Sequence, residues 1–347
     1  MNTTVGIILA VAIAFVITAA LGFVMIPWLH KLKFGQTILD IGPSWHKKKQ
    51  GTPTMGGIMF VIGITVAVAV VFITDKLLGS KLMQTELGIS LNQNMAKLWG
   101  GFFMAFGFAV IGFIDDYIKV AKKRNLGLTI KQKTFMQLAL SLAYIFCLYS
   151  QGCTYTVIPF VSGKIDLGIW FVLLALCVIY GAINAVNFTD GIDGLCTSVT
   201  FTAAIAFIVI AALQKFAGVS ILAAALAGGC VGFLVWNWHP AKVFMGDTGS
   251  LFMGGLIVAL AFGVDCPIIL LPVGIIYVIE AMSDVIQIGY FKLTHGKRIF
   301  KMAPIHHHFE MSGWSEVKIV VVFSIINIIG SIAGILLVYY GVVVFNK

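Results

Sequence analysis

The sequence predicts an all-α polytopic membrane protein with about ten transmembrane helices, formed by residues 1–347 as one integral-membrane domain. Of the 347 residues, 60% are hydrophobic and only 11% are charged, and the mean hydropathy is +1.01. A soluble chain of this length needs more polar surface than this composition supplies. Long uncharged runs also recur along the whole chain, at lengths suited to crossing a bilayer. These observations exclude an ordinary soluble protein.

Ten apolar runs are long enough, or nearly so, to cross about 30 Å of hydrocarbon. Two of them, Leu251–Val264 and Cys266–Ile279, are short and are separated by Asp265, and two prolines disturb the second. We interpret them as two helices, the second continuing past Glu280; a single hairpin dipping into the membrane is the alternative. The other eight runs are Val5–Trp28, Met55–Thr74, Leu98–Ile114, Phe135–Gly152, Leu167–Val186, Leu195–Leu213, Phe216–Trp236 and Ile319–Phe345.

The distribution of basic residues predicts the orientation in the membrane. Ten crossings place both termini on one side and five loops on the other, and those loops hold 17 of the 23 Lys and Arg residues. The positive-inside rule makes the five-loop face cytoplasmic and both termini extracytoplasmic. All the polar motifs described below fall in these loops, so we expect the active site on the cytoplasmic face. The loops are residues 29–54, 115–134, 187–194, 237–250 and 280–318.

Three further features of the sequence narrow the class of protein: its net charge, its cysteines and its N-terminal segment. The net charge of +9 is clustered beside the membrane spans, which favours lipid or an anionic substrate over nucleic acid as the partner. The six cysteines show no CxxC spacing and mostly lie in apolar runs, so we interpret them as packing residues. No basic residue precedes the first apolar run, and this run is too long for a signal-peptide core. A cleaved signal peptide is therefore not expected.

An aspartate pair, Asp115-Asp116, stands where an apolar run gives way to lysines. Adjacent carboxylates near lipid repel each other and lose solvation, so a divalent cation with oxygen ligands is a natural partner. If the segment is helical, Lys119 lies on the same face as Asp115. Carboxylates that hold Mg²⁺ beside a lysine suit phosphoryl transfer. A plain salt bridge at a helix end is the alternative. Lys131 and Lys133, which close this loop, are expected to anchor at the interface or to reach lipid headgroups.

Two further loops combine acids with glycine. In Asn187-Phe188-Thr189-Asp190-Gly191-Ile192-Asp193-Gly194, polar residues recur every three positions with no basic neighbour. A tight turn and a helix cap explain one Asp-Gly but not this repetition. Gly246-Asp247-Thr248-Gly249-Ser250 precedes an apolar helix and offers backbone donors to an anion. A metal held by Asp247 and shared with phosphate would explain an acid among those donors. Phe244 is a candidate platform for a base, or an ordinary interfacial aromatic.

The first and last cytoplasmic loops carry basic and histidine motifs. The cluster Lys47-Lys48-Lys49 with Thr52-Pro53-Thr54 either sets topology or presents hydroxyls, backbone donors and charge to a phosphate. His306-His307-His308 cannot comfortably hold one zinc ion from three consecutive positions, so a pyrophosphate cradle is preferred. Upstream, Glu280, Asp284 and Gln287 continue the polar face of a predicted helix.

Together these motifs resemble the polyprenyl-phosphate N-acetylhexosamine-phosphate transferases. The resemblance rests on Asp115-Asp116-Tyr117-Ile118-Lys119, the 187–194 loop and Gly246-Asp247-Thr248-Gly249-Ser250. The segment 302–310, Met-Ala-Pro-Ile-His-His-His-Phe-Glu, and the segment 51–57, Gly-Thr-Pro-Thr-Met-Gly-Gly, are similar to the bacterial branch that handles N-acetylmuramoyl-pentapeptide. The resemblance covers the whole chain.

The resemblance implies a reaction in a bacterial plasma membrane. Phospho-N-acetylmuramoyl-pentapeptide moves from UDP-MurNAc-pentapeptide to undecaprenyl phosphate, giving lipid I and UMP, with Mg²⁺ as cofactor. This step belongs to peptidoglycan synthesis, and hence to cell wall, cell shape and cell division. One pyrophosphate is broken and another is formed, so no ATP site is needed and the chain carries no P-loop motif. Relatives also imply a homodimer.

The resemblance also implies roles for individual residues. Asp247 matches the Mg²⁺ ligand, and Asp115, with Asp116 beside it, matches the group that receives the proton of the lipid phosphate. The resemblance therefore makes Asp247, and not the aspartate pair, the expected main ligand of the metal. The expected catalytic residues are Asp115, Asp116, Asp247 and His306, and the expected substrate-binding residues are Lys49, Thr54, Lys119, Lys131, Asn187, Asp190, Gly191, Asp193, Phe244, Gly246, Gln287, Ala303, His307 and His308.

Alternatives stay open at this point. Direct attack by the lipid phosphate and a covalent phospho-aspartate route both fit these residues, and we favour direct attack. A transferase that uses UDP-N-acetylglucosamine is the nearest rival. An ion-coupled transporter is a rival of another class, but transporter acids tend to lie near the bilayer midplane, whereas these cluster at helix ends.

Overall fold

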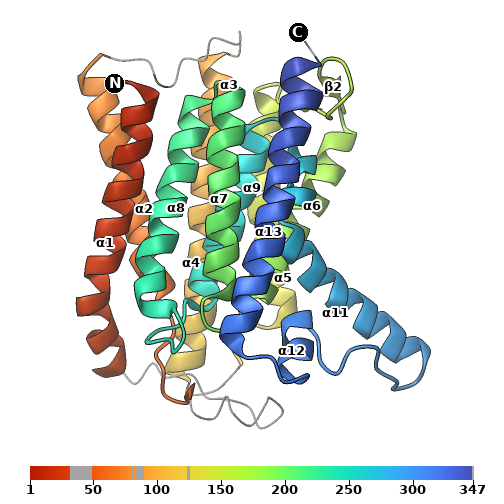
Figure 1. The fold of residues 1–347 in the computed structure, drawn as a ribbon. Helices are drawn as coiled ribbons and strands as arrows, with labels where there is room; N and C mark the ends of the chain where they lie inside the picture. The colour runs from red at the N-terminus through yellow and green to blue at the C-terminus, as the bar shows by residue number, and fades with distance from the viewer. Residues whose placement is uncertain (32–48, 80–81, 83–89, 123–125, 346–347) are drawn as a thin grey trace.

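The computed structural model describes residues 1–31, 49–79, 82, 90–122 and 126–345, and within them the chain is almost entirely helical (Figure 1). Lys47, Lys48 and Arg124 of the basic loops lie outside the described residues. Among the described residues, eight helices are long and apolar enough to span a membrane, or nine if a bent pair counts as one span. The eight are α1 (Thr3–Lys31), α2 (Gly57–Leu77), α3 (Leu91–Met95) continued by η2 (Ala96–Gly100) and α4 (Gly101–Ala121), α6 (Trp170–Thr189), α7 (Leu195–Leu213), α8 (Ala217–Asn237), α9 (Gly246–Gly263), and α13 (Glu316–Val338) continued by η4 (Tyr339–Val344).

Nine of the ten predicted apolar runs lie on described helices. The run Phe135–Gly152 corresponds to α5 (Ile130–Ser150), which packs against α4 and α6 but is not among the eight apolar helices above. Of the two helices predicted around Asp265, the first is α9. The second is broken: the 3-10 turn η3 (Pro267–Ile269) and the short α10 (Leu270–Val273) come before a bend, and only α11 (Ile275–Leu293) continues past Glu280.

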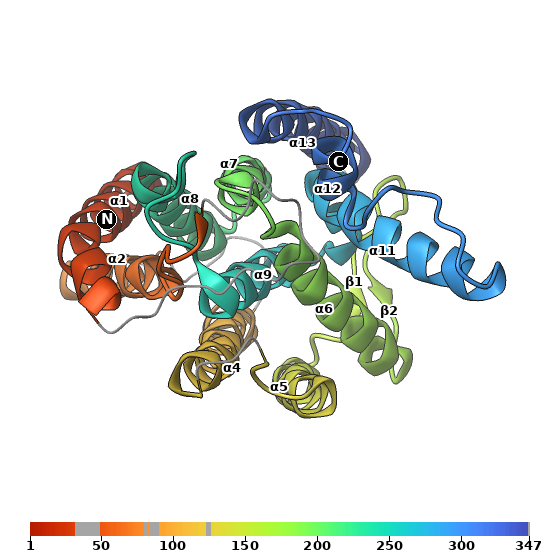
Figure 2. The same ribbon diagram turned by 90° about the horizontal axis from the view of Figure 1, so that it is seen from below.

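Helix α9 is the centre of the molecule (Figure 2). Every residue from Thr248 to Gly263 is buried, and α9 packs against α2, α4, α6, α7 and α8. Glycines permit this crowding: a Cβ added at Gly112 of α4 would lie 2.1 Å from the carbonyl oxygen of Asp247. The backbones of α4 and α9 therefore touch where the polar motifs begin.

Helix α11 leaves the bundle. The segment Pro267–Val273 and α11 meet at an angle of 87°, and α11 extends away from the other helices in Figure 1. The bend falls at Gly274, after Pro272, where proline removes a backbone donor and disfavours helix for the residue before it. The chain then returns through α12 (Ile305–Glu310) to α13 (Glu316–Val338).

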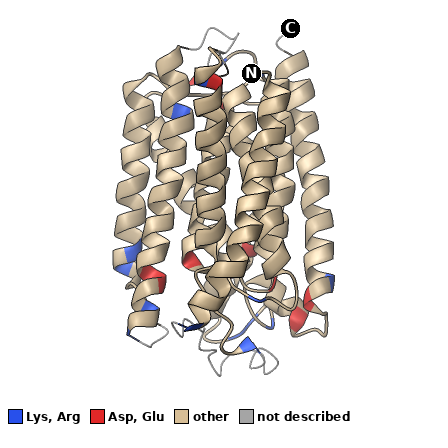
Figure 3. Cartoon of the chain, turned by 90° about the vertical axis from the view of Figure 1, so that its left-hand side faces the viewer, with Lys and Arg blue, Asp and Glu red and all other residues tan. Residues whose placement is uncertain are grey.

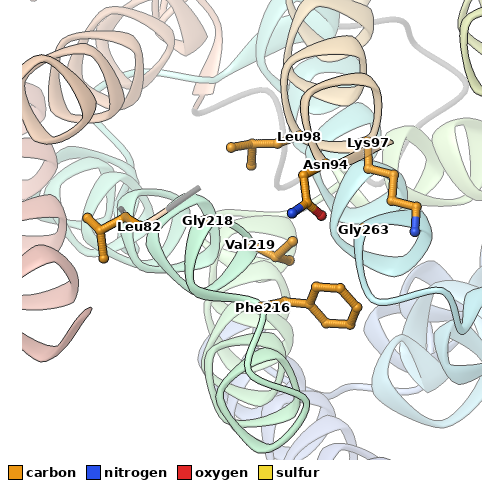
Figure 4. Close-up of a pocket in the computed structure, with 8 residues that line it drawn as sticks. All are labelled: Leu82, Asn94, Lys97, Leu98, Phe216, Gly218, Val219 and Gly263. Carbon is orange, nitrogen blue, oxygen red and sulfur yellow. The ribbon is translucent and has the colours of Figure 1, made fainter. Parts of the chain in front are cut away.

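The all-α prediction misses one small element. Between α5 and α6, β1 (Tyr155–Thr156) pairs antiparallel with β2 (Ile165–Asp166). The buried Lys97 of η2, the turn that precedes α4, donates to the hydroxyl of Tyr155 at 3.0 Å and forms an ion pair with Asp265. Beside this cluster Lys97 and seven neighbours line a cavity of about 20 Å³, the size of one water (Figure 4).

The two ends of the bundle differ in character. The start of α1 and the end of α13 lie together at one end in Figure 1. Figure 3 shows most of the Lys, Arg, Asp and Glu residues at the opposite end. Loops far apart in the sequence therefore meet at this charged end, as the motif distribution predicted.

Candidate functional site

Three carboxylates meet at the charged end of the bundle. Asp115 and Asp116 lie near the end of α4, and Asp247 lies in the first turn of α9. An oxygen from each lies within 4.8 Å of the others. The sequence predicted a loop over 246–250, but α9 begins at Gly246. The acid therefore stands on a helix whose N-terminal amides face the aspartate pair.

Asp116 holds the start of α9 through hydrogen bonds. Its Oδ1 accepts from the backbone N–H of Asp247 at 3.2 Å, and its Oδ2 accepts from the N–H and hydroxyl of Thr248 at 2.9 and 2.7 Å. The first N–H groups of a helix have no partner within the helix. Asp116 satisfies two of them from a neighbouring helix, and it is 2% exposed. Its carboxylate is therefore a fixed structural acceptor.

Asp115 has a different environment. Its Oδ1 accepts from the N–H of Leu128 at 2.7 Å, in the connection that follows α4, and its Oδ2 lies 2.6 Å from Lys119 Nζ. The predicted pairing of Asp115 with Lys119 on one helix face is confirmed. Asp115 is only 3% exposed in the described structure, so the connection at 127–128 covers it.

Asp247 is held by three side chains. Its Oδ2 accepts from Lys119 Nζ at 2.9 Å and from Lys133 Nζ at 3.0 Å, and its Oδ1 accepts from Asn187 Nδ2 at 2.8 Å. The sequence singled out Lys131 as the second lysine, but Lys131 is exposed. Lys133, which we expected only as an interfacial anchor or lipid contact, supplies the charge instead. The two lysines lie two positions apart and so on different faces of α5.

The carboxylates fit a divalent cation. Mg²⁺ prefers closely spaced oxygen ligands. The oxygens of Asp247 are held only by side chains, and those of Asp115 are held by one side chain and one backbone N–H. Asp116 is held instead by two backbone N–H groups of α9, so it has less freedom to bind a cation. The ammonium groups of Lys119 and Lys133 provide the positive charge that three converging carboxylates require.

Residues 187–194 contact two separate clusters of charged side chains. Helix α6 runs to Thr189, so Asn187 is helical, and its Nδ2 donates both to Asp247 and to Ser250 Oγ. Asp193 points the other way. Asp190 lies between them and is half-buried, and its pKa is raised to about 8 by burial and then by the negative charges of Asp247, Asp116 and Asp193.

Asp193 belongs to a second charged cluster. Its Oδ1 lies 2.7 Å from Lys49 Nζ, and its Oδ2 contacts His239 Nδ1 and the N–H of Ala241, both at 3.0 Å. Lys49 also contacts Glu316 Oε2 at 2.6 Å. Lys49 of the first loop therefore lies beside the 187–194 segment. His239 and Glu316 were not anticipated, because only the fold shows that they converge on Asp193.

Thr54 and Gly246 lie together, as predicted. The backbone N–H of Phe244 donates to Pro53 O at 2.9 Å, and that of Gly56 donates to Phe244 O at 2.8 Å. This pairing brings the Thr54 hydroxyl to Gly246, where a Cβ would lie 2.7 Å from it. Gly246 also has a φ of +68°, which favours glycine. Phe244 is half-buried beside this turn.

The histidines lie on α12 and point to separate partners. His306 is fully buried, and its Nδ1 lies 3.0 Å from Glu280 Oε2 of α11. His307 Nδ1 lies 2.6 Å from Glu310 Oε2. The His306 ring is therefore enclosed, whereas His307 is half-buried nearer the surface.

The remaining predicted residues surround this helix. His308 Nδ1 accepts from the N–H of Lys301 at 3.1 Å. Gln287 is occupied by its own loop: its Oε1 accepts from the N–H of Ile299 and Phe300, and its Nε2 donates to Phe300 O. Ala303 is half-buried before the start of α12. Gln287 thus positions the chain that leads to the histidines.

Comparison with known proteins agrees with this site. Residues 98–264 match the family described as Glycosyl transferase family 4, and residues 49–61 match the Phospho-N-acetylmuramoyl-pentapeptide-transferase signature 1. Curated phospho-N-acetylmuramoyl-pentapeptide-transferases are similar over nearly their whole length. That of Listeria monocytogenes serotype 4b (strain CLIP80459) is 46% identical over 330 residues, covering 95% of this chain and 97% of the relative. That of Bacillus anthracis (strain A0248) is 44% identical over 338 residues, covering 97% and 98%.

The chain belongs to the phospho-N-acetylmuramoyl-pentapeptide-transferase family. A relative from Oceanobacillus iheyensis, 42% identical over 335 residues, covers 95% of this chain and 97% of its own. The signature of the phospho-N-acetylmuramoyl-pentapeptide-transferases spans Lys49 and Thr54, and the broader family match includes the three carboxylates. The family identified from the motifs is confirmed, and the chain is a transferase.

The lysines at this end of the bundle give a first prediction. Lys133→Ala removes the positive charge beside Asp247 and is expected to lower transferase turnover at least about tenfold, the loss of a hydrogen bond between charged groups. Lys122→Ala, the matched control, removes an exposed charge just after α4 and should cost less than about threefold. Steady-state rates of both purified variants check this. Equal losses would contradict the placement of Lys133.

Asp190 gives a prediction about pH. Its folded pKa of about 8 lies above the value of about 3.9 expected in the unfolded chain, so the folded state binds an extra proton between these values. Stability from this group is therefore lost as pH rises toward 8. Asp190→Asn removes this dependence, so its melting temperature relative to wild type should rise by a few degrees between pH 5 and pH 8, measured in detergent.

Asp166 provides the control for that experiment. It lies in the exposed β2 strand, and its pKa is lowered by hydrogen bonds from the N–H of Gly168 and the hydroxyl of Thr154. Both its folded and unfolded pKa values lie below 5, so the melting temperature of Asp166→Asn relative to wild type should stay constant from pH 5 to pH 8. A constant gap for Asp190→Asn as well would contradict a raised pKa.

Proposed function

We propose that this chain transfers phospho-N-acetylmuramoyl-pentapeptide from UDP-MurNAc-pentapeptide to undecaprenyl phosphate, forming lipid I and UMP in peptidoglycan synthesis. One observation carries the proposal. In a member of this family, Asp247 meets the Asp115-Asp116 pair and two lysines at one end of an apolar bundle. A lipid phosphate at the membrane surface and a soluble nucleotide can both reach such a site.

The same proposal includes Mg²⁺. Asp247 is the main ligand, with a share from Asp115, and the cation would neutralise pyrophosphate oxygens and stabilise charge on the transferred phosphoryl group. Supporting this choice, the site offers oxygen donors and no sulfur, which suits a hard cation.

The protein's own groups orient the reactants and move the proton. Asp115 receives the proton of the lipid phosphate, although the second pKa of a phosphate monoester near 6 leaves little to remove at neutral pH. Lys119 and Lys133 exchange their carboxylate contacts for phosphate oxygens. Asn187 keeps Asp247 oriented through the hydrogen bond to Oδ1. We propose direct attack by the lipid phosphate, because the carboxylates are already engaged by lysine and amide groups.

The donor substrate occupies the loops around this centre. Uridine binds the α6–α7 connection, and the sugar and peptide extend toward α12. In this proposal Lys131, at the exposed start of α5, attracts phosphates. His306 contributes to catalysis although its ring is buried. The nucleotide side comprises Lys49, Thr54, Asn187, Asp190, Gly191, Asp193, Phe244 and Gly246, and the sugar-peptide side comprises Gln287, Ala303, His307 and His308.

We propose that the chain is a multi-pass protein of the bacterial plasma membrane with a fixed orientation. Helix α5 joins the eight apolar helices and the bent pair to give ten crossings. Both termini are then extracytoplasmic, the site is cytoplasmic, and residues 1–347 form one domain that assembles as a homodimer. The positive-inside rule supports this orientation, and cysteine labelling of loops from either side, together with the mass of the detergent-solubilised protein, tests it.

Release of UMP tests the reaction. Purified protein should release UMP from UDP-MurNAc-pentapeptide only when Mg²⁺ and undecaprenyl phosphate are both present, and at least about a hundredfold faster than from UDP-N-acetylglucosamine. Preference for UDP-N-acetylglucosamine would move the chain to the rival activity. One equivalent of UMP released without lipid would contradict direct attack. Folded protein with no UMP release under any of these conditions would refute the proposed reaction.

Two aspartate variants separate the metal from the acceptor. Asp247→Asn is expected to weaken Mg²⁺ binding at least about tenfold. Asp115→Asn is expected to retain Mg²⁺ and nucleotide binding but to lose at least about a hundredfold in turnover. Calorimetric titration of Mg²⁺ and UMP checks binding, and the UMP assay checks turnover. If both variants lost Mg²⁺ equally, the separate roles would be wrong.

A further inference from the structure

A carboxylate–histidine pair lies behind the site, between α11 and α12. Glu280 and His306 are both 0% exposed. Glu280 Oε2 lies 3.0 Å from His306 Nδ1 and 3.5 Å from the backbone N of His306. One carboxylate oxygen therefore accepts from the ring and from the start of α12. The pair connects the helix that leaves the bundle to the helix that carries the three histidines.

The outer atoms of this pair have no partner. Glu280 Oε1 and His306 Nε2 are buried and make no hydrogen bond to any described residue. Buried polar atoms are nearly always paired, so an exception calls for a reason. The reason lies on the far side of the ring: a Cβ added at Gly191 would lie 2.1 Å from His306 Nε2. The imidazole therefore occupies the space that a side chain at position 191 would fill.

We infer that Glu280 is a positioning residue for donor-nucleotide binding. It fixes the orientation of the His306 ring, and the ring in turn supports Gly191 and the adjacent Asp190. Glu280 touches neither substrate nor the reacting atoms. The inference rests on the proposed function, in which the α6–α7 connection holds the uridine.

The chemistry of the pair explains why an acid occupies position 280. An ionised carboxylate only accepts hydrogen bonds and so selects the tautomer with the proton on Nδ1, while Nε2 is the ring atom nearest to position 191. A glutamine could donate as well as accept and would allow the ring to adopt either tautomer.

The test combines spectroscopy with binding on the full chain in detergent. Protein labelled with ¹⁵N-histidine and ¹⁵N-glycine is compared as wild type, Glu280→Gln and Asp166→Asn. Asp166 of β2 is exposed and contacts Thr154 and Gly168, so its change from carboxylate to amide is the matched control. In Glu280→Gln the Nδ1 and Nε2 signals of His306 and the amide signal of Gly191 should shift, and the Kd for UDP-MurNAc-pentapeptide should rise about tenfold. In Asp166→Asn the signals should not move and the Kd should stay within about twofold.

Several outcomes decide the matter. A KM for the donor that rises with Kd, while kcat and the KM for undecaprenyl phosphate stay within about twofold, supports positioning. A lower melting temperature with unchanged signals and Kd would overturn it and leave Glu280 only a packing role. The NMR signals are recorded without nucleotide. A shift of both the His306 and the Gly191 signals in Glu280→Gln therefore supports the positioning even if wild type binds no UDP-sugar. Failure of wild type to bind any UDP-sugar would refute only the proposed function.

Gly191→Ala keeps the inference testable if Glu280→Gln does not fold. The added methyl group presses on His306 from the opposite side while Glu280 stays in place. It should shift the same His306 signals and weaken donor binding to a similar extent. Unchanged His306 signals in folded Gly191→Ala protein would overturn the proposed contact.

Discussion

The start of α9 is the constraint on which the rest of the site depends. A helix that is buried along its length must have its N-terminal amides satisfied by protein, since neither water nor lipid reaches them. Asp116 of α4 accepts from the amides of Asp247 and Thr248, and Gly112 allows the two backbones to touch. The distance from the aspartate pair to Asp247 is therefore set by helix packing. A site for phosphoryl transfer gains from this rigidity, because misplacement of the reacting groups is costly.

The charges around Asp247 divide into fixed and exchangeable ones. Asp116 is fixed by three hydrogen bonds to α9, and Asp115 is held by the amide of Leu128. The ammonium groups of Lys119 and Lys133 lie at the ends of flexible stems and are only partly buried. They can leave a carboxylate for a phosphate oxygen at little cost, because both partners are anionic oxygens. The carboxylates hold the geometry, and the lysines adapt to the substrate.

Sequence reasoning succeeded where one helix decides the outcome. The apolar runs predicted the helices, and the four-residue spacing predicted the Asp115–Lys119 pair. It failed where the rotation of a helix about its own axis matters: Lys131 and Lys133 look alike in the sequence, and only the packing of α5 against α4 and α6 turns Lys133 inward. The partners of Asp193 were hidden for the same reason, because they come from loops and helices distant in the chain. The β1–β2 hairpin was missed because each strand has only two residues, too few to show an alternating pattern.

The α6–α7 connection links every part of the site, which explains its composition. Together with the last turn of α6 it contacts Asp247 through Asn187, the His306 ring through Gly191, and Lys49 through Asp193. A connection that touches three neighbours within a few residues cannot carry large side chains on the faces it presents to them. Glycine is required at 191 by the His306 ring and at 194 by a φ of +76°. Asp190 precedes the first of these glycines and Asp193 precedes the second, so both acids stand beside a constrained backbone position. A displacement at either the Asp247 side or the His306 side is therefore transmitted to this connection.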